Sequence, residues 1–132
     1  MDNLFEMIPD SLKNVSSYEI SKAVVKILDT KKAEDIKCLK IDSKTVIADY
    51  FVICTGHSST QIKALADEVE YKLGVGGVDY IRLEGNDSTD WKVLDCKDVI
   101  VHIFSTEARE FYKLDRLWSD CEEIDISKIL NS

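Results

Sequence analysis

The chain has 132 residues, of which 45% are hydrophobic and 32% charged, with only five Gly and one Pro. This is the length of one domain, and the composition excludes collagen-like, low-complexity and intrinsically disordered chains. Seventeen Lys and Arg against twenty-five Asp and Glu give a net charge of −8. That charge disfavours direct contact with DNA or RNA, which depends on neutralising phosphates, and would suit a basic protein partner.

The first half of the chain predicts a helix, two strands and a second helix. Residues 1–15 are expected to be a loosely attached lead-in, because Pro9 interrupts any long helix. Ser16 and Glu19 have the spacing of a capping box, and the apolar residues that follow predict a helix over 17–31. We expect a strand at 35–41 and, from a continuous apolar run, a central strand at 50–54 that is covered on both faces. Ser58 and Ser59 are candidate N-caps of a helix over 59–73.

The second half predicts three strands and a last helix. The strands are expected at 80–84, 91–95 and 99–105, and the helix at 107–119, with Thr106 as its cap and with Leu114, Leu117 and Trp118 packed on the sheet. Residues 16–120 would then form the domain, and 121–132 a C-terminal tail. The predicted fold class is α/β: a single domain with a mixed five-stranded sheet flanked by helices.

The chain offers little sign of catalytic chemistry or of a metal site. The turn at 55–59 lies between a strand and a helix N-terminus, where backbone N–H groups can hold an anion, but the pattern favours a simple capped turn. A nucleotidyltransferase would follow it with an Asp-x-Asp pair, which the sequence does not contain. His57 and His102 are the only histidines. We therefore expect no enzyme activity, no catalytic residue, no metal and no cofactor.

The cysteines and the apolar runs point to a reduced, cytoplasmic setting. No apolar run approaches the roughly 20 residues of a membrane-spanning helix, and the acidic first residues argue against a signal or transit peptide. The cysteines lie too far apart for a zinc or redox motif, and we expect them to be free thiols. They are Cys38, Cys54, Cys96 and Cys121.

The hairpin at 91–104 carries apolar residues on both faces. With Cys96 and Lys97 as a two-residue loop, Trp91 would pair with His102, and a register slip of one residue would exchange the faces. One face would carry Trp91, Val93, Ile100, His102 and Phe104. Helices could cover it, or it could dock a partner, since aromatic side chains are favoured at the centres of interfaces.

The last helix places a cation beside an aromatic ring. Arg109 and Tyr112 are separated by three residues and are therefore neighbours on the helix surface. An Arg in this position is either solvated or part of the same docking face.

Five segments in a fixed order resemble the ribosomal silencing factors, also called Iojap-like proteins, over about residues 18–119. The segments are Ala48–Gly56 with Ser58, Ser59 and Gln61; Glu84–Gly85; Trp91–Asp95; Asp98–Phe104; and Arg109–Trp118. The resemblance implies a fold related to nucleotidyltransferases but without catalysis. It further implies binding to ribosomal protein fourteen of the large subunit, where the factor prevents the small subunit from joining and so represses translation.

The same resemblance assigns the residues of the partner surface. It implies that Trp91, His102, Arg109 and Tyr112, together with Val93 and Ile100, lie at or beside the surface for the ribosomal protein. The family commonly has Gly where this chain has Lys97, so the hairpin turn is expected to differ. A homodimer is a further implication, with apolar surface contributed by Leu4, Phe5, Met7 and Ile8.

Two other functions compete with translational repression. One is a divergent nucleotide-binding protein or nucleotidyltransferase that uses the turn at 55–59. The other is an assembly factor of the large subunit, which would use the same surface as a silencing factor.

Overall fold

A computed structural model describes residues 6–85 and 88–131 of the chain. The elements are α1 (Ser17–Thr30), β1 (Glu34–Lys40), β2 (Tyr50–Gly56), α2 (Ser59–Val75), β3 (Arg82–Glu84), β4 (Trp91–Asp95), β5 (Val99–Ser105), α3 (Thr106–Tyr112), α4 (Leu114–Leu117), β6 (Glu122–Ile124) and α5 (Ile126–Leu130). The described strands form one mixed sheet in the order β3-β4-β5-β2-β1-β6. It has six strands rather than the expected five.

The sheet is built around two parallel strands, β2 and β5, which pair along their whole length. The neighbouring pairs β1–β2, β4–β5, β3–β4 and β1–β6 are antiparallel. Every residue of β2 is buried, as its continuous apolar sequence predicts for a strand covered on both faces.

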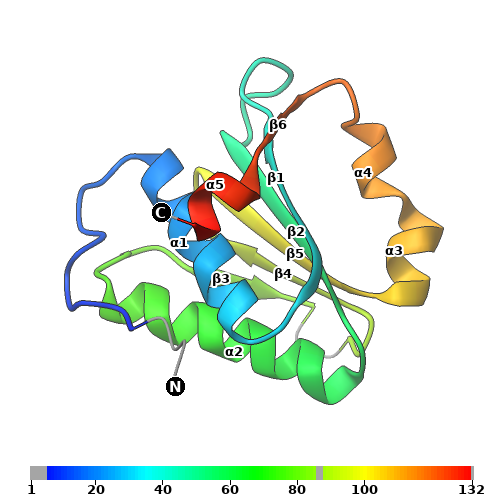
Figure 1. Cartoon of the computed structure of the whole chain (residues 1–132), viewed down its shortest axis with the longest axis horizontal. Coiled ribbons are helices and arrows are strands. Elements are labelled where there is room, and N and C mark those ends of the chain that lie inside the picture. The colour runs from blue at the N-terminus through cyan, green and yellow to red at the C-terminus, as the bar shows by residue number, and fades with distance from the viewer. Residues whose placement is uncertain (1–5, 86–87, 132) are drawn as a thin grey trace.

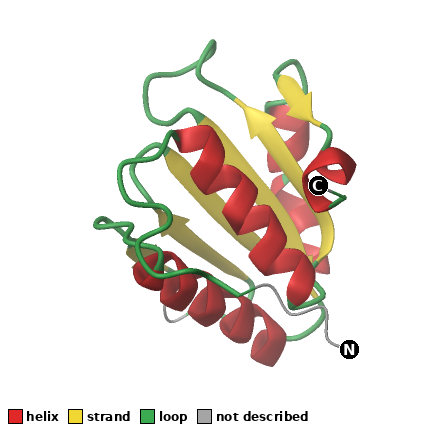
Figure 2. Cartoon of the chain, turned by 60° about the vertical axis from the view of Figure 1, so that its left-hand side comes forward, coloured by secondary structure: helices red, strands yellow, loops and turns green. Residues whose placement is uncertain are grey.

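Helices cover the two faces of the sheet unequally (Figures 1 and 2). The long helices α1 and α2 pack on one face over the larger apolar core, which includes Val24, Leu28, Val52, Leu65 and Leu94. The short helices α3 and α4 lie on the other face over a smaller core that includes Leu39, Phe51, Ile53 and Phe104. The second face is therefore the less completely covered of the two.

Side-chain caps start the helices close to the predicted positions. Ser16 Oγ accepts from Glu19 N, and Ser58 Oγ accepts from Gln61 N, which confirms the predicted caps of α1 and α2. The cap of α3 is Ser105, whose Oγ accepts from Ala108 N, and not Thr106. Gly56 allows α2 to approach β2 closely, because a Cβ there would lie 2.8 Å from the Ile62 side chain.

The predicted register of the β4–β5 hairpin is wrong by two residues. Trp91 pairs with Phe104 and Val93 with His102. The two-residue turn lies one position further along the chain than predicted: Cys96 N donates to the Val99 carbonyl across Lys97 and Asp98. The Asp98 carbonyl accepts hydrogen bonds from the Asp49 and Tyr50 N–H groups at the start of β2. Lys97 has φ 75°, a left-handed conformation that favours glycine. A shift of two keeps each side chain on its face, so the predicted composition of both faces is confirmed.

The predicted helix over 107–119 is also wrong, because it is two short helices. Lys113 has φ 51° and ψ 44°, which ends α3 and redirects the chain into α4. After this break Leu114 and Trp118 pack on the smaller core, whereas Phe111 and Leu117 are 77% and 72% exposed. The expectation that Leu117 packs on the sheet is therefore wrong.

Both ends of the described chain contact the larger core. Met7 and Leu12 pack against it, and Asp10 N and Leu12 N donate to carbonyls at the end of α2. At the other end β6 extends the sheet beside β1, and Ile129 of α5 is buried. Leu4 and Phe5, named above for a homodimer, lie outside the described residues.

All four cysteines are buried and unpaired. Burial raises the pKa of Cys38 to about 11 and the pKa values of Cys54 and Cys96 to about 12. Cysteine reacts as the thiolate, so these thiols should be inert in the native protein.

We expect Ellman's reagent to label Cys38, Cys54 and Cys96 of the folded protein at least about a hundredfold more slowly than a free thiol at pH 8, because their raised pKa values leave little thiolate. The same reagent should count four thiols at once in guanidinium chloride. Rapid labelling of any of these three cysteines in native buffer would contradict the raised pKa values.

Candidate partner surface

Aromatic side chains gather where α3 lies beside β4 and β5. The Trp91 ring is 4.9 Å from that of Phe104 and 4.6 Å from that of Tyr112, measured between centroids. Phe104 is fully buried, Trp91 half-buried and Tyr112 52% exposed. Phe111 stands edge-on to Tyr112 at 5.0 Å. We call Trp91, Phe111 and Tyr112 the aromatic patch; Phe104 supports it from beneath.

The aromatic patch borders a groove of about 560 Å³ between α3 and residues 88–91. Its other lining residues are Ser88, Asp90, Glu107 and Ala108. The groove therefore combines an aromatic wall with two carboxylate-bearing residues at its rim. An apolar side chain next to a cation is the kind of partner group that such a surface accepts.

His102 lies beneath the aromatic patch and is 93% buried, with a relative exposure of 7%. Its Nδ1 accepts a hydrogen bond of 3.2 Å from the Trp91 indole Nε1–H. Burial lowers the pKa of His102 to about 4, so the ring is neutral at pH 7. The imidazole also stands edge-on to Phe51, 4.8 Å between centroids.

Val93 and Ile100 lie beside this cluster on the same face and are half-buried. Val93 on β4 pairs with His102 on β5, and Ile100 on β5 pairs with Phe51 on β2. Five of the six residues assigned from the sequence thus lie on one side of the sheet: Trp91, Val93, Ile100, His102 and Tyr112.

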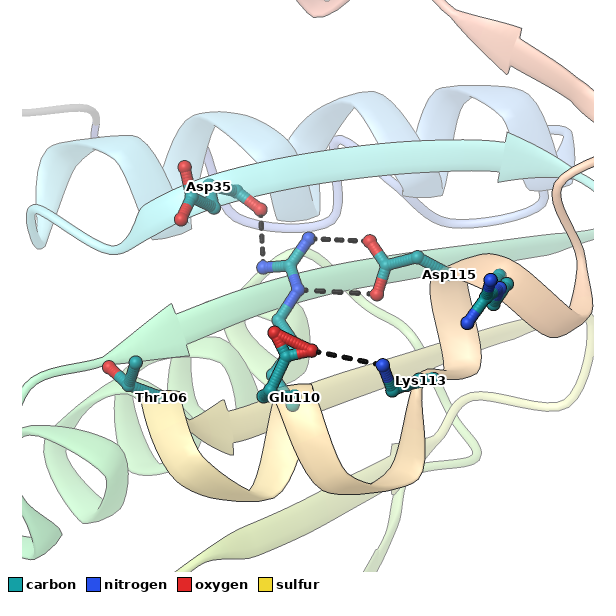
Figure 3. Close-up of a pocket in the computed structure, with 7 residues that line it drawn as sticks. Asp35, Thr106, Glu110, Lys113 and Asp115 are labelled. Atoms are coloured by element: carbon teal, nitrogen blue, oxygen red, sulfur yellow. Dashed lines mark hydrogen bonds and ion pairs between the residues drawn. The ribbon is translucent and has the colours of Figure 1, made fainter.

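Arg109 points away from this cluster, toward β1 and β2. Its guanidinium donates to both carboxylate oxygens of Asp115, to the Asp35 carbonyl and to Thr55 Oγ1, at 2.6–3.2 Å. We call these bonds the Arg109 network; Figure 3 shows Asp115 and the Asp35 carbonyl on either side of the guanidinium. The Arg109 side chain is only 13% exposed.

Local backbone geometry builds the Arg109 network. A bulge in β1 and a φ of 50° at Asp35 turn the Asp35 carbonyl toward α3. The break at Lys113 brings Asp115 back over Arg109. Burial alone would raise the pKa of Asp115, but the hydrogen bonds and charge of Arg109, aided by Lys37, outweigh it and lower that pKa.

The turn at 55–59 is a capped turn in which the N–H groups of His57 and Gln61 are already used. His57 N donates to Gln61 Oε1, and Gln61 N donates to Ser58 Oγ. The His57 ring pairs with Glu34 at 3.0 Å. Among residues 6–85 and 88–131, no three His, Cys, Asp or Glu side chains gather as a metal site would require, and no helix could cross a membrane.

Phe111 and the groove were not predicted from the sequence. With a single helix over 107–119, Phe111 falls on the packed side together with Leu114. One signal was available: Phe111 and Tyr112 are adjacent, so one helical stripe cannot bury both.

Comparison with known proteins gives one consistent family. Residues 14–132 match the family model RsfS, "Ribosomal silencing factor during starvation". A ribosomal silencing factor of Halalkalibacterium halodurans is 33% identical over 117 residues, covering 89% of this chain and all of the relative. A crystal structure of a Chromobacterium violaceum protein superposes with a TM-score of 0.77 at 35% identity, over 80% of this chain and 88% of that one.

A mouse protein named "Mitochondrial assembly of ribosomal large subunit protein 1" is also related. It is 31% identical over 99 residues, which make up 73% of this chain and 43% of the mouse protein. Relatives of this chain are thus found in bacteria and in an animal.

Arg109→Lys should lower the free energy of unfolding by roughly 1–3 kcal/mol, because an ammonium cannot reproduce the bidentate pair with Asp115. Chemical denaturation would measure this. Arg116→Lys on exposed α4 is the matched control and should change stability by less than about 0.5 kcal/mol. Equal effects of the two variants would contradict a specific role for the Arg109 network.

Acid should destabilise the fold through His102. Its pKa lies below the ordinary 6.5 at about 4, so between these values the unfolded chain takes up a proton that the native ring does not. The contribution of His102 to the free energy of unfolding is present in full above pH 6.5 and falls by roughly 3 kcal/mol as the pH drops to about 4. Denaturation series should show this part of the pH dependence disappear in His102→Leu and persist in His57→Asn.

Proposed function

The chain belongs to the RsfS family of ribosomal silencing factors, and from that premise we propose that it represses translation by binding ribosomal protein fourteen of the large subunit. The bound protein would prevent the small subunit from joining. One observation carries the proposal: the exposed aromatic patch, on the less covered face of the sheet, with carboxylates at its rim. This would take place in the cytoplasm, without a cofactor.

The chemistry of the aromatic patch supports a protein partner. Phe111 and Tyr112 are 77% and 52% exposed, and large aromatic side chains supply most of the binding energy in small interfaces. Asp90 and Glu107 at the rim of the groove, and the net charge of −8, favour a basic protein surface over exposed RNA phosphates.

Obstruction needs no chemistry beyond binding. A compact domain of this length has a radius of gyration of about 14 Å. A body of that size on the joining face holds the two subunits apart by more than any hydrogen bond or ion pair can span. Its negative charge would add repulsion toward the phosphates of the approaching subunit, within a Debye length of about 8–10 Å.

The same features support a non-enzymatic role. Two N–H groups at the strand-to-helix turn, those of His57 and Gln61, already donate to side chains of the turn and of α2 and are not free for a nucleotide phosphate. Within residues 6–85 and 88–131, no carboxylate hydrogen-bonds to the buried His102 ring as a partner of a general base would. Burial is the cause of its lowered pKa.

Assembly of the large subunit is a second candidate, favoured by the name of the mouse relative. A factor that covers the joining face could hold an immature subunit apart from the small subunit in the same way. Large-subunit precursors that accumulate during rapid growth in cells lacking the protein would favour assembly; loss of repression only in starved cells would favour silencing.

The proposal predicts that Trp91→Ala weakens binding to the isolated large subunit roughly thirtyfold or more, since truncating an interface Trp costs about 2 kcal/mol or more. Sedimentation of the protein with separated subunits, and of joined ribosomes in its presence, measures binding and repression together. The domain should stay folded, because Trp91 is only half-buried.

Tyr71→Ala is the matched control, since Tyr71 is 68% exposed on α2, on the opposite face of the sheet. It should bind like the parent. A Trp91→Ala protein that unfolds, or that binds as tightly as the parent, would place the partner surface elsewhere. Binding to the small subunit, or to neither, would refute the proposed function itself.

A further inference from the structure

His102 uses one ring nitrogen and leaves the other without a partner. Nδ1 accepts from the Trp91 indole N–H at 3.2 Å. Nε2 is buried and has no hydrogen-bond partner among the residues that the structure describes. Since an accepting Nδ1 carries no proton, the neutral ring must carry its proton on Nε2. A buried donor is therefore left unsatisfied.

This arrangement is unfavourable for stability. An unsatisfied buried donor costs about 1–3 kcal/mol, whereas an apolar side chain of similar volume would avoid that cost. Aromatic neighbours surround the ring: Phe51, Trp91 and Phe104 have centroids at 4.8, 6.0 and 6.0 Å. Leu or Met would suit such surroundings better than His. The acceptor at Nδ1 is what only a polar side chain can supply here.

The acceptor has one donor to act on, the indole of Trp91. Trp91 lies at the start of β4 and packs on Phe104 and Tyr112, contacts that are non-directional and permit the indole to turn. A hydrogen bond at Nε1 fixes the plane of the ring and the edge that it presents to the groove. Because ordering an interface side chain costs binding energy, a ring ordered in advance binds more tightly.

We propose that His102 is a positioning residue, which holds the Trp91 indole in its binding orientation and does not itself touch the partner. The inference rests on the proposed function, because the orientation matters only if the aromatic patch binds. His102 is too deeply buried for a partner to reach Nε2 without a rearrangement of the sheet.

The test compares His102→Leu, which removes the acceptor, with His102→Asn, whose Oδ1 replaces Nδ1. In the free protein, the Trp91 indole N–H signal in a ¹H–¹⁵N spectrum should shift in His102→Leu and exchange with solvent about fivefold or more faster, as expected for one lost hydrogen bond. In His102→Asn the chemical shift and the exchange rate of this signal should stay near those of the parent protein. The Trp118 indole is the internal control, and Trp91→Phe assigns the signal.

Binding to isolated large subunits should weaken about five- to tenfold in His102→Leu, recover in His102→Asn, and change no further when His102→Leu is added to Trp91→Phe. An equal loss in the Trp91→Phe background, or an unaltered indole signal, would overturn the positioning role. If His102→Leu fails to fold, His102→Met takes its place. If the parent does not bind, the proposed function fails, while the indole spectra still decide whether His102 orders Trp91.

Discussion

The parallel pairing of β2 with β5 is the constraint on which the rest of the molecule depends. It aligns Gly56 with Ser105, so both strands end at the same edge of the sheet. Each leads directly into a helix capped by a serine, Ser58 for α2 and Ser105 for α3. The two helices leave this edge on opposite faces of the sheet. The position of α3, and with it the aromatic patch, follows from that common edge.

The Arg109 network sets how far α3 extends over the second face. Its bonds to Asp35, Thr55 and Asp115 join β1, β2 and α4 to one side of α3. The opposite side then carries Tyr112 against Trp91. Arg109 and Tyr112 are close in sequence but have different roles: Arg109 fixes the position of α3, and Tyr112 contributes to the aromatic patch. Sequence spacing alone groups the two together, because it cannot say which side of a helix meets which strand.

Patterns with a short physical range were predictable from the sequence, and features that depend on distant contacts were not. The alternation of β4 and β5 assigned their faces correctly even with a register error of two residues, because the side-chain period is two. The break at Lys113 was missed because no Gly or Pro marks it. That left-handed residue lies where α3 ends and the chain turns back so that Asp115 meets Arg109. The strand β6 was missed because three residues carry almost no periodic signal.

A protein that binds a partner through an apolar surface must expose that surface without losing its native fold. Here the exposed rings rest on a fully buried Phe104, so the aromatic patch is a continuation of the core and moves with it. Carboxylates at the rim of the groove and a net charge of −8 oppose association between copies, since like charges repel. His102 accepts an energetic penalty at Nε2 to supply an acceptor at Nδ1. The fold loses stability at one buried atom, and in return the half-buried indole of Trp91 is held in place.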